Sequence, residues 1–184
     1  MNPCFFCPAN CCKSYTITVT AFDVLRAASA SGRKPVEFAT LHRARLLAFD
    51  PDTTLDIEGD GWSYLLGFMS HPCVFLRLGG NKSGASKPDT RKPNANTCTI
   101  HASAPLSCRR YPFQLDGKLN TRMCPLASQL VFRLKGAGVP ATQLVRELEL
   151  HKTLVREWNK NPGNKVECIA FLLKRAREIS ASSE

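Results

Sequence analysis

Hydrophobic residues recur at helical spacing through the last third of the chain. Leu144, Leu148, Leu154 and Trp158 fall on or near one face of a segment that starts at Pro140, a residue favoured in the first turn of a helix. Similar spacing is found on both sides of this segment. The pattern predicts helices over residues 126–135, 140–158 and 166–179.

The first third of the chain mixes helical and strand periodicity. Alternating residues predict a short strand over 13–19, and an apolar run predicts another over 62–69. Thr20 is followed three residues later by Asp23, which resembles a capping box with Asp in place of the usual Glu, so we expect a helix to begin there. An imperfect apolar stripe predicts a further helix over 35–48.

These elements together predict a mainly helical α+β fold, in which a small β-element and loops carry a cysteine site and pack on C-terminal helices. We expect residues 1–125 to form a cysteine-cluster, metal-binding domain and residues 126–184 a helical part packed on it. The segment 79–97 is basic and rich in Gly, Ser and Pro. That composition predicts a flexible loop.

Cysteine is the residue type that says most about the function of the chain. Eight of the nine cysteines precede residue 126. They begin with a Cys-x-x-Cys pair and an adjacent Cys-Cys pair and continue as four single residues, a pattern suited to ligation of a metal by thiolates from several segments. The ninth, Cys168, lies beside Ile169 and Phe171 on a predicted helix, and we expect it to be a small core residue. The candidate ligands are Cys4, Cys7, Cys11, Cys12, Cys73, Cys98, Cys108 and Cys124.

Disulfide bonds are the alternative use of so many cysteines. They require an oxidising compartment, whereas the first residues lack the basic and apolar stretches of a signal peptide. No apolar segment reaches the roughly 20 residues of a membrane-spanning helix, so no membrane association is expected. A cytoplasmic protein with reduced thiols is the interpretation that follows, and the odd cysteine count also fits complete pairing badly.

The formal net charge of +10 is concentrated between and just after the later cysteines. Residues 77–96 carry five basic and one acidic side chain, and residues 109–135 carry six and one. Because a thiolate-bound centre is anionic, part of this charge is expected to offset it, with Arg109 and Arg110 beside Cys108 as candidate contacts to the cofactor. The remainder indicates a possible acidic protein partner. Nucleic acid is a poor candidate, since the basic segments have few aromatic residues between them.

The order of these motifs resembles the YkgJ family of bacterial cysteine-cluster proteins. The resemblance rests on Cys4-x-x-Cys7-x-x-x-Cys11-Cys12, on Cys73-Val-Phe-Leu, on Cys98-x-Ile, on Pro105-x-x-Cys108-Arg-x-Tyr-Pro-Phe and on Cys124-Pro. It covers roughly residues 4–125 and implies a domain that chelates zinc or iron. Flagellin lysine methylases carry a similar cluster, so the resemblance also reaches an enzyme.

The chain departs from the family pattern at two positions near Cys98. His101 stands where the family usually has an aromatic residue, and Ala104-Pro105 stands where it usually has Arg-Pro. His101 could add a ligand or could be an ordinary polar residue. The adjacent Cys11 and Cys12 are hard to place in one tetrahedron if neighbouring side chains diverge. Either they serve different centres, or one supports the site without ligating.

An all-cysteine ligand set suits both zinc and an iron–sulfur cluster, including the 4Fe–4S type. Closed zinc sites commonly pair two short knuckles, and here only the first block is one, so the iron–sulfur cluster is favoured. A redox or metal-handling role follows. The alternative is a protein-modifying enzyme of the lysine methyltransferase kind, although the sequence has no Gly-x-Gly-x-x-Gly motif after a strand to hold a nucleotide-like cofactor.

Overall fold

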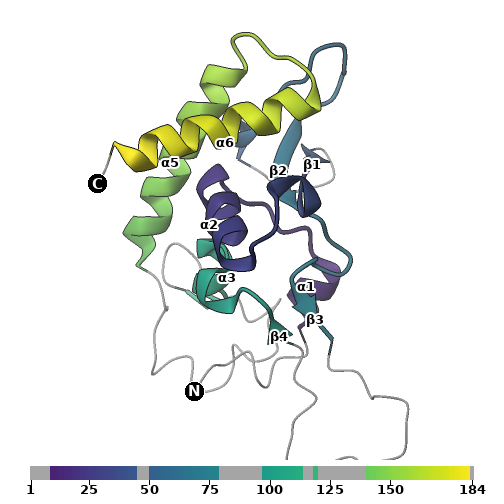
Figure 1. Ribbon diagram of the computed structural model, residues 1–184, viewed down its shortest axis with the longest axis vertical. Coiled ribbons are helices and arrows are strands. Elements are labelled where there is room, and N and C mark those ends of the chain that lie inside the picture. Colours follow the sequence, from purple (N-terminus) through teal and green to yellow (C-terminus); the bar gives the residue numbers. More distant parts are fainter. Residues whose placement is uncertain (1–8, 45–49, 79–96, 114–117, 120–139, 183–184) are drawn as a thin grey trace, which may run out of the picture.

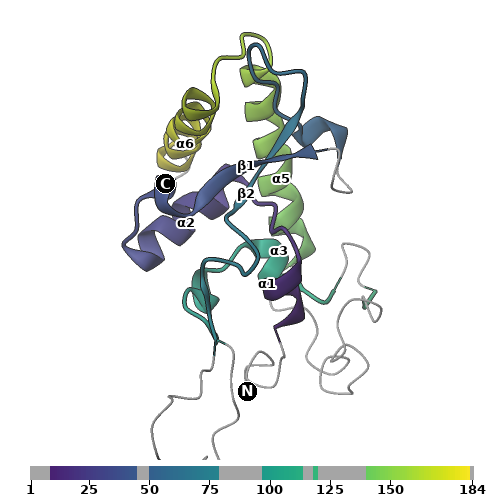
Figure 2. The same ribbon diagram turned by 90° about the vertical axis from the view of Figure 1, so that its right-hand side faces the viewer.

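The computed structural model describes residues 9–44, 50–78, 97–113, 118–119 and 140–182. The three longer helices and the larger sheet lie together, and the shorter elements gather at the opposite end of the molecule (Figures 1 and 2). The first group comprises α2 (Ala21–Ser31), β1 (Ala39–Arg43), β2 (Tyr64–Phe68), α5 (Ala141–Trp158) and α6 (Lys165–Ala181). The second comprises α1 (Asn10–Ser14), β3 (Leu76–Arg77), β4 (Thr97–Cys98) and α3 (Leu106–Arg110).

Helix α2 begins at the predicted capping box. The Thr20 side chain accepts a hydrogen bond from the Asp23 amide, and the Asp23 carboxylate accepts one from the Thr20 amide. These bonds satisfy two backbone donors that the first turn of a helix leaves without a partner. The helix ends at Gly32, whose φ of 67° lies in the left-handed region that glycine adopts most readily.

Helices α5 and α6 confirm the two predictions at residues 140–158 and 166–179. The buried residues of α5 recur at helical spacing and face the core, as do those of α6. Helix α6 packs on both α2 and α5. The predicted helix at 126–135 lies outside the described residues. The buried residues of the two helices are His151, Leu154, Val155 and Trp158 in α5, and Cys168, Leu172, Leu173 and Ala176 in α6.

The larger sheet pairs β1 with β2 in antiparallel register, with Ala39 opposite Phe68 and Arg43 opposite Tyr64. Strand β2 confirms the prediction for residues 62–69. The predicted helix over 35–48 is wrong for its described part, because residues 35–37 form a 3₁₀ turn and 39–43 form β1. The apolar stripe there was imperfect, and pairing with a fully buried strand outweighs the weak helical preference of five residues.

The predicted strand over 13–19 is wrong in its first half. Lys13 and Ser14 close α1, and only Thr18 forms a bridge, opposite Gly67. The chain then runs extended along β2, where the Val19 amide donates to the Leu66 carbonyl at 3.0 Å. Glycine is required at residue 67, since a Cβ there would lie 2.6 Å from a ring carbon of His42.

An aromatic cluster joins the sheet to the cysteine-bearing end. Phe38, Phe68 and Phe75 pack edge-on or tilted, with ring centroids 5.0 to 5.6 Å apart. Phe38 and Phe75 come from separate segments, and Phe75 lies only two residues after Cys73. The core therefore fixes the backbone on which Cys73 is carried.

The architecture confirms the predicted class, a mainly helical α+β fold with small antiparallel sheets. Within the described ranges, none of the helices combines the length and apolar character needed to cross a bilayer.

Candidate metal centre

Helix α1 carries the adjacent pair Cys11 and Cys12. Their Sγ atoms lie 3.9 Å apart. Two thiolates bound tetrahedrally to one metal at about 2.3 Å are separated by about 3.8 Å. The premise that neighbouring side chains diverge is therefore wrong for this pair, whose spacing suits a single metal atom.

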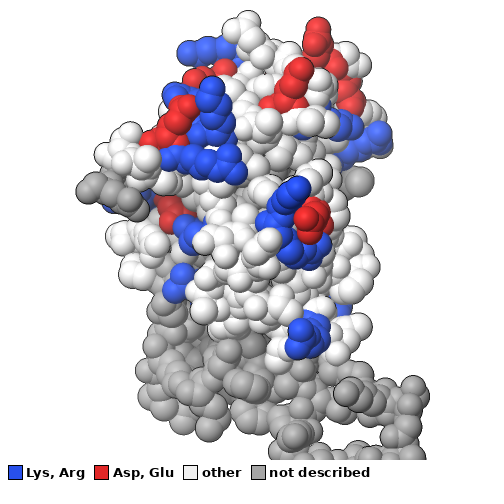
Figure 3. Space-filling view, viewed as in Figure 1, with Lys and Arg blue, Asp and Glu red and all other residues white. Residues whose placement is uncertain are grey.

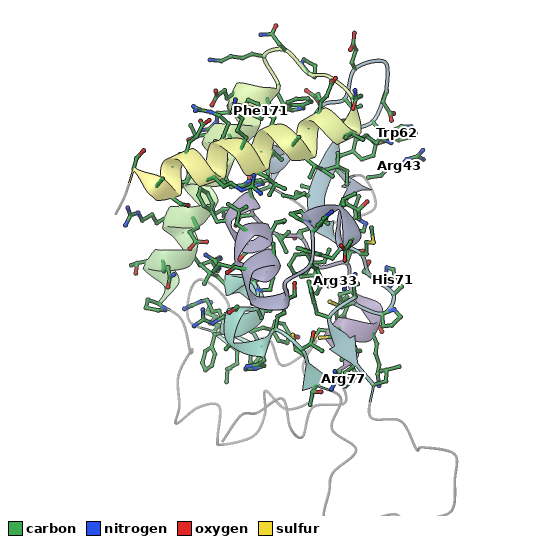
Figure 4. The ribbon with its side chains drawn as sticks, in the orientation of Figure 1. Arg33, Arg43, Trp62, His71, Arg77 and Phe171 are labelled. Atoms are coloured by element: carbon green, nitrogen blue, oxygen red, sulfur yellow. The ribbon has the colours of Figure 1, made fainter. Side chains whose placement is uncertain are left out.

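Cys73 is held against α1 by the backbone. Its amide donates to the Cys12 carbonyl at 2.6 Å, and its own carbonyl accepts from the Leu76 amide at 2.8 Å. The residue is buried. His71, just before it, lies beside α1 (Figure 4) and its Nε2 is 3.5 Å from the Thr16 hydroxyl. Two segments 61 positions apart in sequence are thus fixed together next to a thiol pair.

Cys98 and Cys108 reach the same end of the molecule from two further elements. Cys98 ends β4 and is paired with Leu76 of β3. Cys108 lies at the centre of the five-residue helix α3. The fold therefore delivers thiols from α1, from the turn before β3, from β4 and from α3.

The thiols at this end lie close enough for the charge of one to act on the pKa of another. Burial raises the pKa of Cys73, and the charges of Cys98 and Cys11 raise it further. Burial and the Cys11 charge act in the same direction on the pKa of Cys98. The pKa of Cys108 is raised well above its usual value by burial, by Asp23 and by Cys11, Cys73 and Cys98. Solvent reaches the Cys108 side chain, so we attribute this direction more to the charges of Asp23 and the other thiols than to burial. The negative charge of one thiolate therefore disfavours ionisation of a neighbouring thiol, and a bound cation would remove that penalty.

The α1 pair has one thiol that ionises readily. The hydrogen bond between the two side chains lowers the pKa of Cys11 to about 7. The same bond, followed by burial and the Cys11 charge, raises the pKa of Cys12. Either sulfur can donate in this bond, and a thiolate is the form that binds a metal, so the α1 pair supplies one thiol that ionises more readily than an ordinary cysteine.

The donor set fits a thiophilic metal but is incomplete within the described residues. The six cysteines described there are free thiols. In these same ranges no three Cys, His, Asp or Glu side chains already converge as a metal site. Cys4, Cys7 and Cys124 lie outside the described residues, so a complete centre needs donors from those segments or a closer approach of the described thiols.

The predicted cofactor contacts Arg109 and Arg110 both lie on α3, where Arg109 is exposed and Arg110 is buried. A buried guanidinium two residues from Cys108 suits a site that gathers negative charge. His101 is half-buried in the 3₁₀ turn His101–Ser103. On the upper part of the face shown in Figure 3, Lys and Arg side chains of the described residues lie among Asp and Glu, whereas lower on this face a few basic side chains have no acidic side chain beside them. Much of the basic segment 77–96 lies outside the described residues.

Cys168 stands apart from this group and confirms the core prediction. It is fully buried on α6. Burial raises the pKa of its thiol to about 12, with no other cause. No charged neighbour contributes, in contrast to the cysteines at the other end.

Two buried polar residues near α3 have surroundings that were not predicted from the sequence. His151 lies on the buried face of α5, and burial lowers its pKa to about 4. Asp23 was recognised as a capping residue, but its contact with α3 was not expected. The one signal for His151 was its place in the apolar stripe of a helix. Both residues line a cleft of about 250 Å³, together with Thr18, Val19, Thr20, Asp50, Thr53, Leu65, Leu66, Ser107, Leu144 and Leu148.

The comparison with protein families decides the assignment. Residues 3–125 match the model of the CxxCxxCC family, described as a "putative zinc- or iron-chelating domain". The chain belongs to this family. The match confirms the cysteine-cluster family suspected from the motifs and supports metal binding as the chemistry of the cysteine end. No curated protein and no solved structure matches the chain.

Proposed function

We propose that the protein holds an iron–sulfur cluster through its clustered cysteines and serves in electron transfer or metal handling in the reducing cytoplasm. The observation that carries the proposal is the gathering of thiols at one end of the fold. The Sγ atoms of Cys11 and Cys12 lie 3.9 Å apart there, and the Cys73 amide donates to the Cys12 carbonyl. Cys11, Cys73, Cys98 and Cys108 come from four separate elements, and the charge of Cys11 raises the pKa of each of the other three. Side chains that repel one another when ionised are retained together where a cation neutralises them.

Iron–sulfur is favoured over zinc by the way the ligands are supplied. Apart from the α1 pair, each described thiol comes singly from its own element, which suits a centre whose metal atoms lie apart. The 3.9 Å spacing of Cys11 and Cys12 suits two thiolates on one metal atom. Zinc and a 2Fe–2S cluster both offer that arrangement, whereas a 4Fe–4S cluster takes one protein thiolate at each iron. Arg109 and Arg110 would help to offset the negative charge of the centre.

The ligand set belongs to the same proposal. It comprises the five described thiols at this end together with three cysteines from outside the described residues: Cys4, Cys7, Cys11, Cys12, Cys73, Cys98, Cys108 and Cys124. The lysine methyltransferase alternative and the acidic protein partner stay hypotheses from the sequence.

The test is purification without oxygen, followed by iron, zinc and acid-labile sulfide analysis. The account expects brown protein with broad visible absorption that bleaches on reduction with dithionite. Colourless protein with stoichiometric zinc, unchanged after reconstitution with iron and sulfide, would reject the cluster and keep the cysteine site. Protein that retains neither metal would contradict both.

A further inference from the structure

Helix α3 carries Cys108 but cannot be held by its own hydrogen bonds. It has five residues, far fewer than an isolated helix needs to persist in water. Its N-cap residue, Pro105, has no side chain able to accept from the first-turn amides, and no side-chain cap is formed there. The position of Cys108 therefore depends on contacts made with the rest of the molecule.

Asp23 supplies the missing cap from another helix. Its Oδ1 accepts a hydrogen bond at 3.0 Å from the amide of Leu106, the first residue of α3. Asp23 is 2% exposed and Leu106 is fully buried, so water does not replace this bond easily. A carboxylate at the start of a helix also interacts favourably with the partial positive charge of its free amides.

The remaining contacts of Asp23 fix the direction of its carboxylate. Oδ2 accepts from the Thr20 amide at 3.1 Å and from the Thr20 hydroxyl at 3.0 Å. Oδ1 is also paired with Arg26, whose guanidinium donates to both carboxylate oxygens of Glu147 on α5 at 2.7 and 2.8 Å. The first turn of α3 is thereby connected to α2 and α5 through one buried carboxylate.

We propose that Asp23 is a positioning residue for the metal centre, which sets the place of Cys108 by capping α3 and is itself held by Arg26 and Glu147. The inference rests on the proposed role of Cys108 as a ligand. Asp23, which is not itself a ligand, then sets the position of the Cys108 thiol relative to the other ligands. Residues that contact metal ligands commonly have this role. Asp23 also lies close enough to Cys108 for its charge to act on that thiol.

The first test substitutes the carboxylate and keeps its size. Asp23→Asn leaves a single acceptor oxygen for the Thr20 and Leu106 amides and removes the charge facing Arg26. We expect the affinity of the metal-free protein for Zn²⁺, measured by competition with a chromophoric chelator, to fall by about tenfold or more. Glu149→Gln, on the same helix as Glu147 but exposed and bound to Lys152, is the matched control and should keep the wild-type affinity.

A second readout does not depend on metal. Amide hydrogen exchange in the metal-free protein should quicken in the peptide that contains Leu106–Arg110 and stay at its wild-type rate in α6. A merely structural role of Asp23 would quicken exchange in both. If Asp23→Asn does not fold, Glu147→Gln carries the test, since it weakens the hold on Arg26 while leaving the Asp23–Leu106 bond. We expect an affinity loss of about two- to fivefold for Glu147→Gln, at the low end of effects of groups around ligands.

The outcomes separate the two proposals. Wild-type affinity and unchanged α3 exchange in Asp23→Asn would overturn the positioning role and leave the metal site intact. If Asp23→Asn does not fold, wild-type affinity and unchanged α3 exchange in Glu147→Gln would overturn the positioning role. A wild-type protein that binds no metal would reject the proposed function, and the positioning of a metal ligand would fall with it. If amide exchange in Asp23→Asn were then faster in α3 alone, Asp23 would be a helix cap with no role in metal binding.

Discussion

The two ends of the molecule use the same residue type in opposite ways. At the helical end, Cys168 is fully buried among apolar side chains, and burial alone raises the pKa of its thiol to about 12. At the cysteine end, Cys73, Cys98 and Cys108 interact with one another's charges as well as with the protein around them. The difference shows that the surroundings of a cysteine decide how its thiol ionises: burial alone acts on Cys168, whereas charged neighbours also act on the thiols at the cysteine end.

The sources of stability differ in the same way. Helices α2, α5 and α6 bury a continuous apolar core and carry their own caps at α2 and α6. The elements that bear Cys11, Cys12, Cys98 and Cys108 have five residues or fewer. Elements this short depend on contacts with the core and, in our account, on a bound metal.

The largest effect on folding is expected from the centre of the helical end. Leu172 is fully buried on α6, so Leu172→Ala should lower the free energy of unfolding by about 3–5 kcal/mol through lost burial and the cavity left behind. Urea denaturation measures the loss. The bound metal per folded protein should stay unchanged, and a proportional loss of metal would show that the two ends are not separable. Leu78→Ala, at a residue 53% exposed, is the control and should change stability by less than about 0.5 kcal/mol.

The next effect is a loss of stability in acid caused by His151. Burial lowers its pKa to about 4 in the folded protein, against 6.5 as its ordinary value. The unfolded chain therefore binds the proton more readily, so this contribution is complete above pH 6.5 and is lost as the pH falls towards 4. The total is about 3 kcal/mol. Urea denaturation across this range should show a shallower pH dependence for His151→Asn, and equal slopes would contradict the assignment.

Cys168→Ala should have a smaller effect and separates packing from ligation directly. Removing one buried sulfur should cost about 1–2 kcal/mol, as measured by denaturation, and leave the metal content intact. Any drop in metal stoichiometry in this variant would place Cys168 among the ligands.

The smallest effect is expected at the surface of α5. Arg156 and Asp52 form an ion pair at 3.0 Å in which both side chains are more than half exposed. Water screens such pairs, so Arg156→Ala should change the free energy of unfolding by less than about 1 kcal/mol. A thermal melt with and without added salt checks this, because a larger, salt-insensitive loss would mean that the pair matters more than its exposure indicates.

The helical end could be predicted well from the sequence because its signals are local. The Thr20–Asp23 cap and the spacing of Leu154 and Trp158 each lie within a few turns of one helix. The prediction at residues 35–48 failed because five residues with no strong preference take the conformation that their partner β2 imposes.

The cysteine end was predictable in its composition but not in its geometry. Cysteine spacing indicated a metal centre, and the family match agrees with it. The 3.9 Å approach of Cys11 and Cys12 depends on side-chain directions in one short helix, and the bond from Leu106 to Asp23 joins residues 83 positions apart. Neither follows from local periodicity, since both are set by how the elements pack.

X-ray absorption at the edge of the bound metal tests the central claim most directly, because it counts the atoms around that metal. The account predicts a first shell of sulfur at about 2.3 Å in the wild-type protein and in Cys168→Ala, and a loss of bound metal in Cys11→Ala/Cys12→Ala, which lacks two of the proposed ligands. For an iron–sulfur cluster, a second iron should appear beyond the sulfur. A first shell of oxygen or nitrogen in the wild-type protein would contradict the claim that the clustered cysteines hold the metal. Full metal content with an unchanged sulfur shell in the double variant would contradict the assignment of Cys11 and Cys12 as ligands.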